Sequence, residues 1–213
     1  MAFSQKLYDA ILAGQAGDAQ AGVKEALAAG VNPAELIADT MIPAMDEVGR
    51  LFEEEEYFVP ELLLAGRAMK AAMEPLRPLL AATGAKPSGV IVVGTVHGDL
   101  HDIGKNLVGS MLEGGGFEVH DLGADVSPEK FIAAIREHKP QIVCLSALLT
   151  VTMPAMKSTL AAFEEAGVRG EVKVLIGGAP VNADYAREIG ADGYGATAND
   201  AVSLARKFVR KAA

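Results

Sequence analysis

One short segment of this chain places a histidine close to carboxylates and glycine: Asp99, His101 and Gly104 form an Asp-x-His-x-x-Gly pattern. It follows the apolar run 90–96, which is typical of a buried parallel strand, and precedes a helical pattern at 105–112. The segment is therefore expected in a loop at the carboxyl end of a strand, where open α/β sheets bind ligands. A histidine oriented by a nearby carboxylate is typical of a metal ligand.

Two other interpretations of this loop have to be considered. Its glycines suggest a phosphate cradle, but Gly98 and Gly104-Lys105 are separated by five residues instead of four, and Asn106 replaces the magnesium-binding hydroxyl. The carboxylates of Asp99 and Asp102 would also repel phosphate. An ordinary surface histidine is the second alternative, and we expect it to apply to the three other histidines, at positions 97, 120 and 138.

A second group of candidate residues follows two later strands of the expected sheet. Ser146, Thr150 and Thr152 supply hydroxyls near the carboxyl end of the expected strand 141–148, and Gly177-Gly178 lie at the end of the expected strand 172–177. Two adjacent glycines let the backbone approach a ligand closely. In a flavodoxin-like strand order, the loop that carries His101 lies beside the loop after Ser146.

Composition limits the class of protein. The chain has 213 residues, half of them hydrophobic, which suffices for one large domain or two small ones. No apolar run is long enough for a membrane span and no signal peptide is recognisable. Cys144 is the only cysteine, which excludes an internal disulfide and a thiolate cluster, and we expect it to be a packing residue. These features predict a cytoplasmic protein without a membrane partner.

The charge distribution argues against nucleic acid as a partner. The net charge is −9: residues 1–87 have 7 basic and 13 acidic residues (−6), and residues 88–213 have 12 and 15 (−3). Both halves would repel a phosphate backbone. The acidic run 53–56 is interpreted as a solvated helix end, with a docking patch for a basic partner as the alternative.

The two halves differ in their periodicity. Residues 1–81 have helical spacing throughout, with start signals at Asn32-Pro33 and Val59-Pro60 and an expected kink at Pro43. They predict a four-helix bundle, followed by a linker at 82–88. Beyond it, strands are expected at 89–96, 117–122, 141–148, 172–177 and 191–195, and helices at 104–114, 127–138, 153–167, 182–189 and 199–211. Asn182 and Asn199 are the expected caps of the last two helices.

The predicted fold class is thus α/β: an N-terminal four-helix bundle cap followed by a flavodoxin/Rossmann-like five-stranded parallel sheet with helices on both faces. The predicted domains are 1–87, the helical cap with its linker, and 88–213, the α/β domain.

Three motifs at these spacings resemble the cobalamin-binding module of corrinoid methyltransferases, as in cobalamin-dependent methionine synthase. They are Asp99-x-His101-x-x-Gly104, then Ser146-x-Leu148, then Gly177-Gly178. His97 departs from the lysine that is usual in that enzyme. The bundle also resembles the helical cap of the same family, at Val48–Phe52 and Phe58–Glu61, so that the resemblance covers nearly the whole chain.

The resemblance implies a role for each matching residue. His101 is the lower axial ligand of cobalt in a base-off cobalamin or related corrinoid, and Asp99 accepts its second ring proton. Thr152 stands in for the serine of the family and completes the relay. The displaced nucleotide tail of the cofactor lies along Gly104, Ser146, Leu148, Thr150, Gly177 and Gly178. Phe58 is the candidate lid over the upper face, and Leu62 is either part of that lid or bundle core.

The function implied is that of a corrinoid protein carrying a methyl group on cobalt, with little turnover alone. Its partners are a donor-specific methyltransferase subunit, an acceptor methyltransferase and a reductive activator protein, because the chain has no room for a substrate-activating barrel. The donor is methanol, a methylamine or a methoxylated aromatic. A cobalamin-binding mutase subunit and a cobalamin-dependent sensor or regulator are the alternatives.

Overall fold

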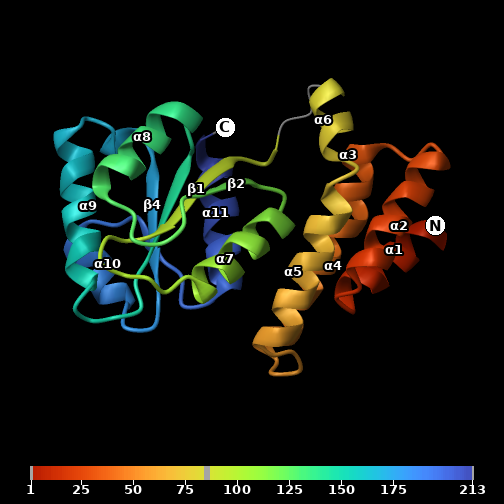
Figure 1. The fold of residues 1–213 in the computed structure, drawn as a ribbon, viewed down its shortest axis with the longest axis horizontal. Helices are drawn as coiled ribbons and strands as arrows, with labels where there is room; N and C mark the ends of the chain where they lie inside the picture. Colours follow the sequence, from red (N-terminus) through yellow and green to blue (C-terminus); the bar gives the residue numbers. More distant parts are fainter. Residues whose placement is uncertain (1, 84–86, 213) are drawn as a thin grey trace. The chain divides into compact units, whose positions relative to one another are not determined.

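The computed structural model describes residues 2–83 and 87–212 (Figure 1). The chain divides into a helical unit, which contains the residues up to Pro87 together with Glu113–Gly116, and an α/β unit, which contains the other residues from Ser88 on. The middle of the expected linker, residues 84–86, lies outside the described residues.

The helical unit is a small bundle whose core is aliphatic and methionine-rich. Leu7, Ile11, Met45, Leu62 and Met69 are all buried in it. Its elements are α1 (Ala2–Leu12), α2 (Ala16–Ala28), α3 (Pro33–Leu36), the π-helical segment η1 (Ile37–Met41), α4 (Ile42–Glu53), α5 (Val59–Met73) and α6 (Arg77–Thr83). The expected third helix is thus divided into three parts, and α6 occupies the start of the expected linker.

The proline positions explain how these helices begin. Asn32 caps α3: its Oδ1 accepts from the N–H of Ala34 at 2.8 Å, and Pro33 follows as the first helical residue. Pro43 falls in the first turn of α4, directly after η1. Because proline lacks an N–H and its ring crowds the preceding turn, the wider π-helical turn accommodates it.

The α/β unit is a five-stranded, all-parallel sheet of order β2-β1-β3-β4-β5, which confirms the expected architecture. The strands are β1 (Val90–Thr95), β2 (Glu118–Asp121), β3 (Ile142–Ser146), β4 (Lys173–Gly177) and β5 (Gly193–Tyr194). The helices are α7 (Ile103–Gly114), α8 (Pro128–His138), α9 (Met153–Glu165), the 3₁₀ turn η2 (Arg169–Glu171), α10 (Ala183–Ile189) and α11 (Ala198–Ala212).

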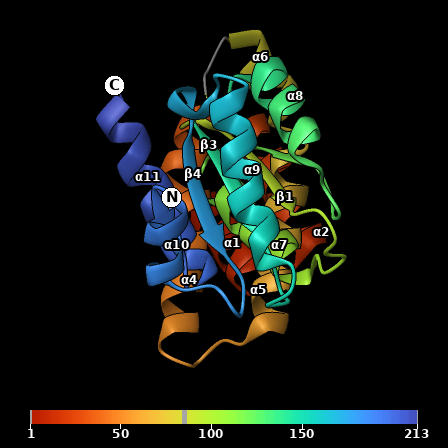
Figure 2. The ribbon, with the colours of Figure 1, turned by 90° about the vertical axis from the view of Figure 1, so that its left-hand side faces the viewer.

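Helices cover both faces of this sheet. α8, α9 and α10 lie on one face, toward the viewer in Figure 2, and α7 and α11 lie on the other. Phe131 and Phe163 fill the core under α8 and α9 with their rings 6.4 Å apart and edge to face. A Cβ on Gly94 would lie 2.7 Å from the ring of Phe131, which explains a glycine inside β1.

One of the two predicted asparagine caps is wrong. Asn182 does cap α10, accepting from the N–H of Tyr185 at 2.8 Å. Asn199, however, lies inside α11, which begins at Ala198. Thr197 and Asp200 form the cap instead, since each side chain accepts from the backbone N–H of the other, at 3.1 and 3.0 Å. This reciprocal pair satisfies two N–H groups, which a single asparagine cannot match.

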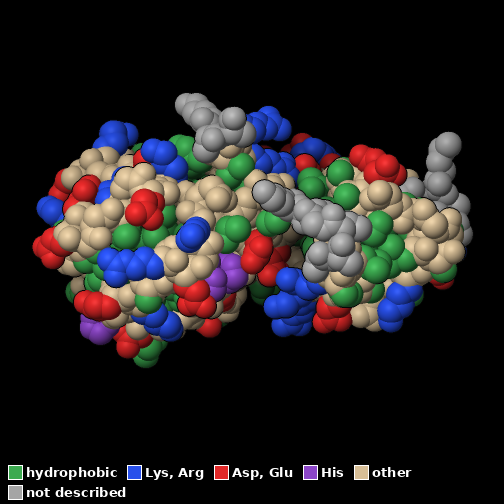
Figure 3. Space-filling view, turned by 90° about the horizontal axis from the view of Figure 1, so that it is seen from above, with side chains coloured by type: hydrophobic (Ala, Val, Ile, Leu, Met, Phe, Trp, Pro, Cys, Tyr) green, Lys and Arg blue, Asp and Glu red, His purple; other side chains and the backbone are tan. Residues whose placement is uncertain are grey.

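Within the described ranges, no helix combines the length and apolar character needed to cross a membrane. Acidic and basic side chains are interspersed on the face drawn in Figure 3.

Candidate functional site

The candidate site lies at the carboxyl edge of the sheet, where the loops after β1 and β3 begin side by side. Thr95 and Ser146, the last residues of the two strands, are paired in register. The N–H of Val96 continues the pairing by donating to the carbonyl of Ser146 at 3.0 Å. The predicted adjacency of these loops is therefore confirmed, at the position where parallel sheets bind ligands.

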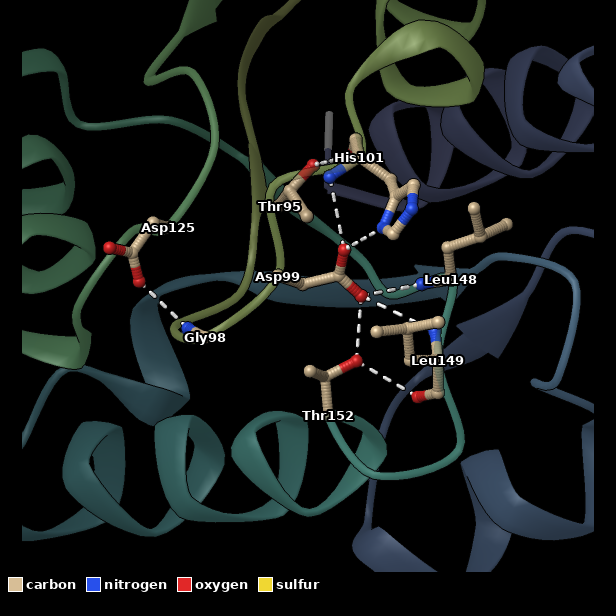
Figure 4. A network of polar contacts seen from close by, with 8 residues as sticks. All are labelled: Thr95, Gly98, Asp99, His101, Asp125, Leu148, Leu149 and Thr152. Carbon is tan, nitrogen blue, oxygen red and sulfur yellow. Dashed lines mark hydrogen bonds and ion pairs between the residues drawn. The ribbon is translucent and has the colours of Figure 1, made fainter.

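Asp99 is the centre of a hydrogen-bond network between these loops (Figure 4). Its side chain is completely buried. Oδ1 accepts from His101, both from Nδ1 at 2.7 Å and from the backbone N–H at 3.0 Å. Oδ2 accepts from the N–H groups of Leu148 and Leu149, at 2.8 and 3.3 Å, and from Thr152 Oγ1 at 2.6 Å. The structure thus brings together Asp99, His101 and Thr152.

The same contacts keep Asp99 ionised. Burial raises the pKa of this carboxyl, but the hydrogen bonds from Thr152, Leu148 and His101 outweigh burial and hold the pKa well below its usual range. Thr152 Oγ1 also lies 2.8 Å from the carbonyl of Leu149. Because a hydroxyl has one proton and the carboxylate is the charged acceptor, that proton points to Asp99.

His101 presents one ring nitrogen outward. Its side chain is 48% exposed, and Thr95 Oγ1 donates to its carbonyl at 2.8 Å, which ties the loop to the end of β1. An ionised Asp99 places the ring proton on Nδ1, so that Nε2 keeps its lone pair. Nε2 has no hydrogen-bond partner in the described part of the chain. The arrangement supplies one oriented imidazole whose Nε2 faces outward.

Exposed apolar side chains are concentrated on the same two loops. Leu100, Ile103, Leu148, Leu149 and Val151 are all exposed. Large apolar side chains gathered around a polar group are typical of a ligand-binding surface. The site is therefore suited to a largely apolar ligand.

The predicted glycines have different surroundings. A Cβ on Gly104 would meet nothing within 4 Å, so this position faces open space. Gly178 has a φ of +123°, and a Cβ there would lie 1.8 Å from the carbonyl oxygen of Ala147, so the fold itself requires glycine. Gly177 pairs in register with Ser146, and a Cβ on it would lie 3.1 Å from the carbonyl of Gly195.

The remaining predicted residues lie as follows. Ser146 is partly buried and Thr150 is exposed. Phe58 precedes α5 in the helical unit and is 61% exposed, whereas Leu62 is buried and belongs to the core of that unit. Cys144 is buried in β3, which raises the pKa of its thiol to about 12 and agrees with a packing role.

The other histidines have partners that sequence reasoning did not predict. His120 and His138 stack with ring centroids 3.8 Å apart. His97 Nδ1 lies 2.7 Å from Oδ1 of Asp125, in the loop after β2. Asp125 was missed; its position at the carboxyl end of the strand beside β1 was the signal that could have identified it.

The described side chains around His101 do not form a metal site from protein ligands alone. Among the described residues, no group of three or more His, Cys, Asp or Glu side chains could hold a metal ion. A lone imidazole with an apolar surround and an open glycine position instead fits a metal that arrives with a macrocycle. These observations fit a corrinoid.

Comparison with known proteins gives the same result. Residues 4–77 and 89–203 each match a family model described as a B12 binding domain. The chain is 47% identical over 189 residues to trimethylamine corrinoid protein 2 of Methanosarcina mazei, covering 88% of this chain and 87% of that protein. It is 42% identical over 180 residues to dimethylamine corrinoid protein 1 of Methanosarcina acetivorans, covering 84% of each.

A solved structure is similar along almost the whole chain. The crystal structure of the methanol:cobalamin methyltransferase complex MtaBC from Methanosarcina barkeri matches with a TM-score of 0.86 and 33% identity, covering 98% of this chain and 80% of that one. The chain therefore belongs to the family of corrinoid, B12-binding proteins of methyltransferase systems.

Proposed function

We propose that this chain binds a corrinoid through His101 and carries a methyl group from a donor-specific methyltransferase to an acceptor methyltransferase. The observation that carries the proposal is the Asp99 network, which orients the ring of His101 and leaves Nε2 without a partner. When bound, the corrinoid supplies a cobalt centre that accepts and releases a methyl group.

In this proposal Asp99 and Thr152 control His101. Asp99 holds the Nδ1 proton, which raises the basicity of Nε2 and fixes the plane of the ring. Thr152 donates to the opposite oxygen of Asp99 and keeps it ionised. If bound, a corrinoid would therefore meet an imidazole whose basicity and orientation are set by Asp99 and Thr152.

The nucleotide tail of the cofactor is proposed to pass along Gly104, Ser146, Leu148, Thr150, Gly177 and Gly178. Three observations support this path. The Cβ position of Gly104 is open, Leu148 and Thr150 are exposed, and the Ser146 hydroxyl makes no hydrogen bond with the described residues. Ser146 and Thr150 are therefore available to hydrogen-bond the tail.

The helical unit is proposed to act as the cap of the cofactor. In this assignment residues 1–87 form the cap with its linker and residues 88–213 form the cofactor-binding domain. An exposed aromatic side chain, Phe58, is available to exclude water from the upper face. Such a cap has to move aside for each partner.

The relatives favour a methylated amine as the donor. The trimethylamine and dimethylamine corrinoid proteins are 47% and 42% identical to this chain, against 33% for the corrinoid chain of the methanol complex. A reductive activator protein completes the proposed set of partners, and the chain alone is expected to have little turnover. We propose a cytoplasmic location for the whole system.

Reconstitution with hydroxocobalamin tests the ligand assignment. The wild type should bind about one equivalent, and the paramagnetic resonance spectrum of its cobalt(II) form should show coupling to one imidazole nitrogen. His101→Ala should lose that coupling, and His120→Ala is the matched control that should keep it. An unchanged spectrum in His101→Ala would refute the assignment.

A second experiment tests the carrier role. The reduced holoprotein is mixed with trimethylamine, dimethylamine, monomethylamine or methanol, each with and without the matching methyltransferase. Methylation of the cofactor should require the partner and be fastest with one of the amines. Methylation without any partner would contradict the proposal, and a carbon-skeleton rearrangement with adenosylcobalamin would favour the mutase alternative.

A further inference from the structure

Asp125, in the loop after β2, contacts the histidine loop from the side opposite to β3. Its Oδ1 accepts from the backbone N–H of Gly98 at 2.7 Å and lies 2.7 Å from Nδ1 of His97. Its own N–H donates to the backbone carbonyl of Asp99 at 2.9 Å. Figure 4 shows Asp125 and Thr152 on different sides of Asp99. One residue thus makes three contacts with the turn 97–99.

The backbone of Asp125 is adapted to this position. Its φ is +53°, in the left-handed region that few side chains other than Asn and Asp adopt readily. Gly98, which it contacts, is also left-handed, with a φ of +82°. Unfavourable conformations of this kind persist where surrounding contacts require them, and they gather at functional sites.

The segment that carries Asp125 is itself anchored to the end of β1. The backbone N–H of Thr95 donates to the carbonyl of Gly123 at 3.0 Å, and the backbone carbonyl of Thr95 accepts from the N–H of Val126 at 2.9 Å. Asp125 is therefore held by the strand from which the histidine loop emerges. Its contacts fix the loop relative to the sheet.

Asp99 is consequently held at two places. The loop 148–152 holds its side chain through Oδ2, and Asp125 holds its main chain through the carbonyl. Since His101 is oriented by Oδ1 of Asp99, any rotation of the turn 97–99 would change the direction of Nε2. We propose that Asp125 is a positioning residue for the cofactor ligand, acting through Gly98 and Asp99 on His101. This inference rests on the proposed role of His101 as the ligand.

Three variants separate the positioning role from a contribution to folding. Asp125→Gly removes the carboxylate but keeps the left-handed backbone without strain. Asp125→Asn keeps an acceptor for Gly98 and tolerates the same backbone. Lys139→Gly is the matched control, because Lys139 ends α8 with a φ of +47° in the same unit and away from the loop.

Each variant is measured with and without cofactor. In the cofactor-free protein, nuclear magnetic resonance follows the hydrogen exchange of the Gly98 amide and the ring-nitrogen shifts of His101. In the protein reconstituted with hydroxocobalamin and reduced to cobalt(II), the electron paramagnetic resonance spectrum gives the ratio of histidine-coordinated to uncoordinated cobalt.

Asp125→Gly should speed the exchange of Gly98 and lower the coordination ratio, each by about tenfold, which corresponds to one lost charged hydrogen bond. Asp125→Asn and Lys139→Gly should remain close to the wild type. Wild-type values in Asp125→Gly would overturn the inference.

If that variant does not fold, Asp125→Asn is the deciding variant. Loss of histidine coordination in Asp125→Asn while the Gly98 amide stays protected would contradict positioning through this hydrogen bond. Absence of histidine coupling in the wild type would instead refute the proposed ligand, and the measurements without cofactor would still test the positioning.

Discussion

Replacing Thr152 by valine tests the energetics of the buried carboxylate. Valine has the shape of threonine but replaces the Oγ1 hydroxyl with a methyl group. The substitution removes a 2.6 Å hydrogen bond to Asp99, whose side chain is completely buried and so cannot recruit water in its place. Thr152→Ser keeps the hydroxyl and is the matched control.

The magnitude follows from the partners that remain. A hydrogen bond to a charged group contributes about 1.5–3 kcal/mol. Asp99 keeps its bonds from His101 and from the N–H of Leu148, so it is not left without partners. We therefore expect Thr152→Val to lower the free energy of unfolding at pH 7 by about 2 kcal/mol. Thr152→Ser should lose less than half of that, since only a methyl group is removed.

The effect should depend on pH in one direction. The pKa of Asp99 is lowered in the folded protein, so its ionisation stabilises the fold above the unfolded pKa, near 4. That stability is lost as the pH falls toward the lower folded pKa. The unfolded pKa is the same in both proteins, so the difference between wild type and Thr152→Val should be constant from pH 5 to 8 and shrink only as the pH falls below the folded pKa of Asp99 in the variant.

Urea unfolding followed by circular dichroism, at pH 7 and at pH 3, measures this difference. Equal stability of the valine and serine variants at pH 7 would refute the reasoning. So would a difference that grows on acidification.

Three further outcomes are expected. Gly178→Ala should destabilise the protein by about 3 kcal/mol or more, measured by urea unfolding, because its φ is +123° and the new Cβ would overlap the carbonyl of Ala147. Gly104→Ala should leave the melting temperature unchanged or slightly raised, because its Cβ meets nothing, while weakening hydroxocobalamin binding about tenfold in a titration. Cys144, with its thiol pKa raised to about 12, should react with iodoacetamide at pH 8 only after unfolding, as mass spectrometry would detect.

The sheet was predictable because its physical signals are local. The strands β1, β3 and β4 each contain a buried, mostly apolar run, and each is followed by a segment whose apolar residues recur at helical spacing. Once the strands are parallel, their carboxyl ends share one edge, so the proximity of the His101 loop to Thr152 follows from the strand order.

The features that were missed depend on competition or on tertiary contacts. The Thr197–Asp200 pair competes with Asn199 for the start of α11, and only the geometry shows which cap forms. The π-helical segment 37–41 arises because Pro43 has to be accommodated within a continuous helical stretch. Asp125 makes its contacts with residues 26–28 positions earlier in the chain, which no periodicity reveals.

The contacts of Asp99 explain why a short motif requires a whole domain around it. Its donors come from the β1 loop and from the loop after β3, and its carbonyl is held from the loop after β2. Together these donors satisfy the lone pairs that burial would otherwise leave unpaired, so removing one of them raises the cost of keeping the carboxylate charged. The orientation of His101 is therefore set when the sheet folds, before any ligand binds, and the ordering of the ring does not have to be supplied by binding energy.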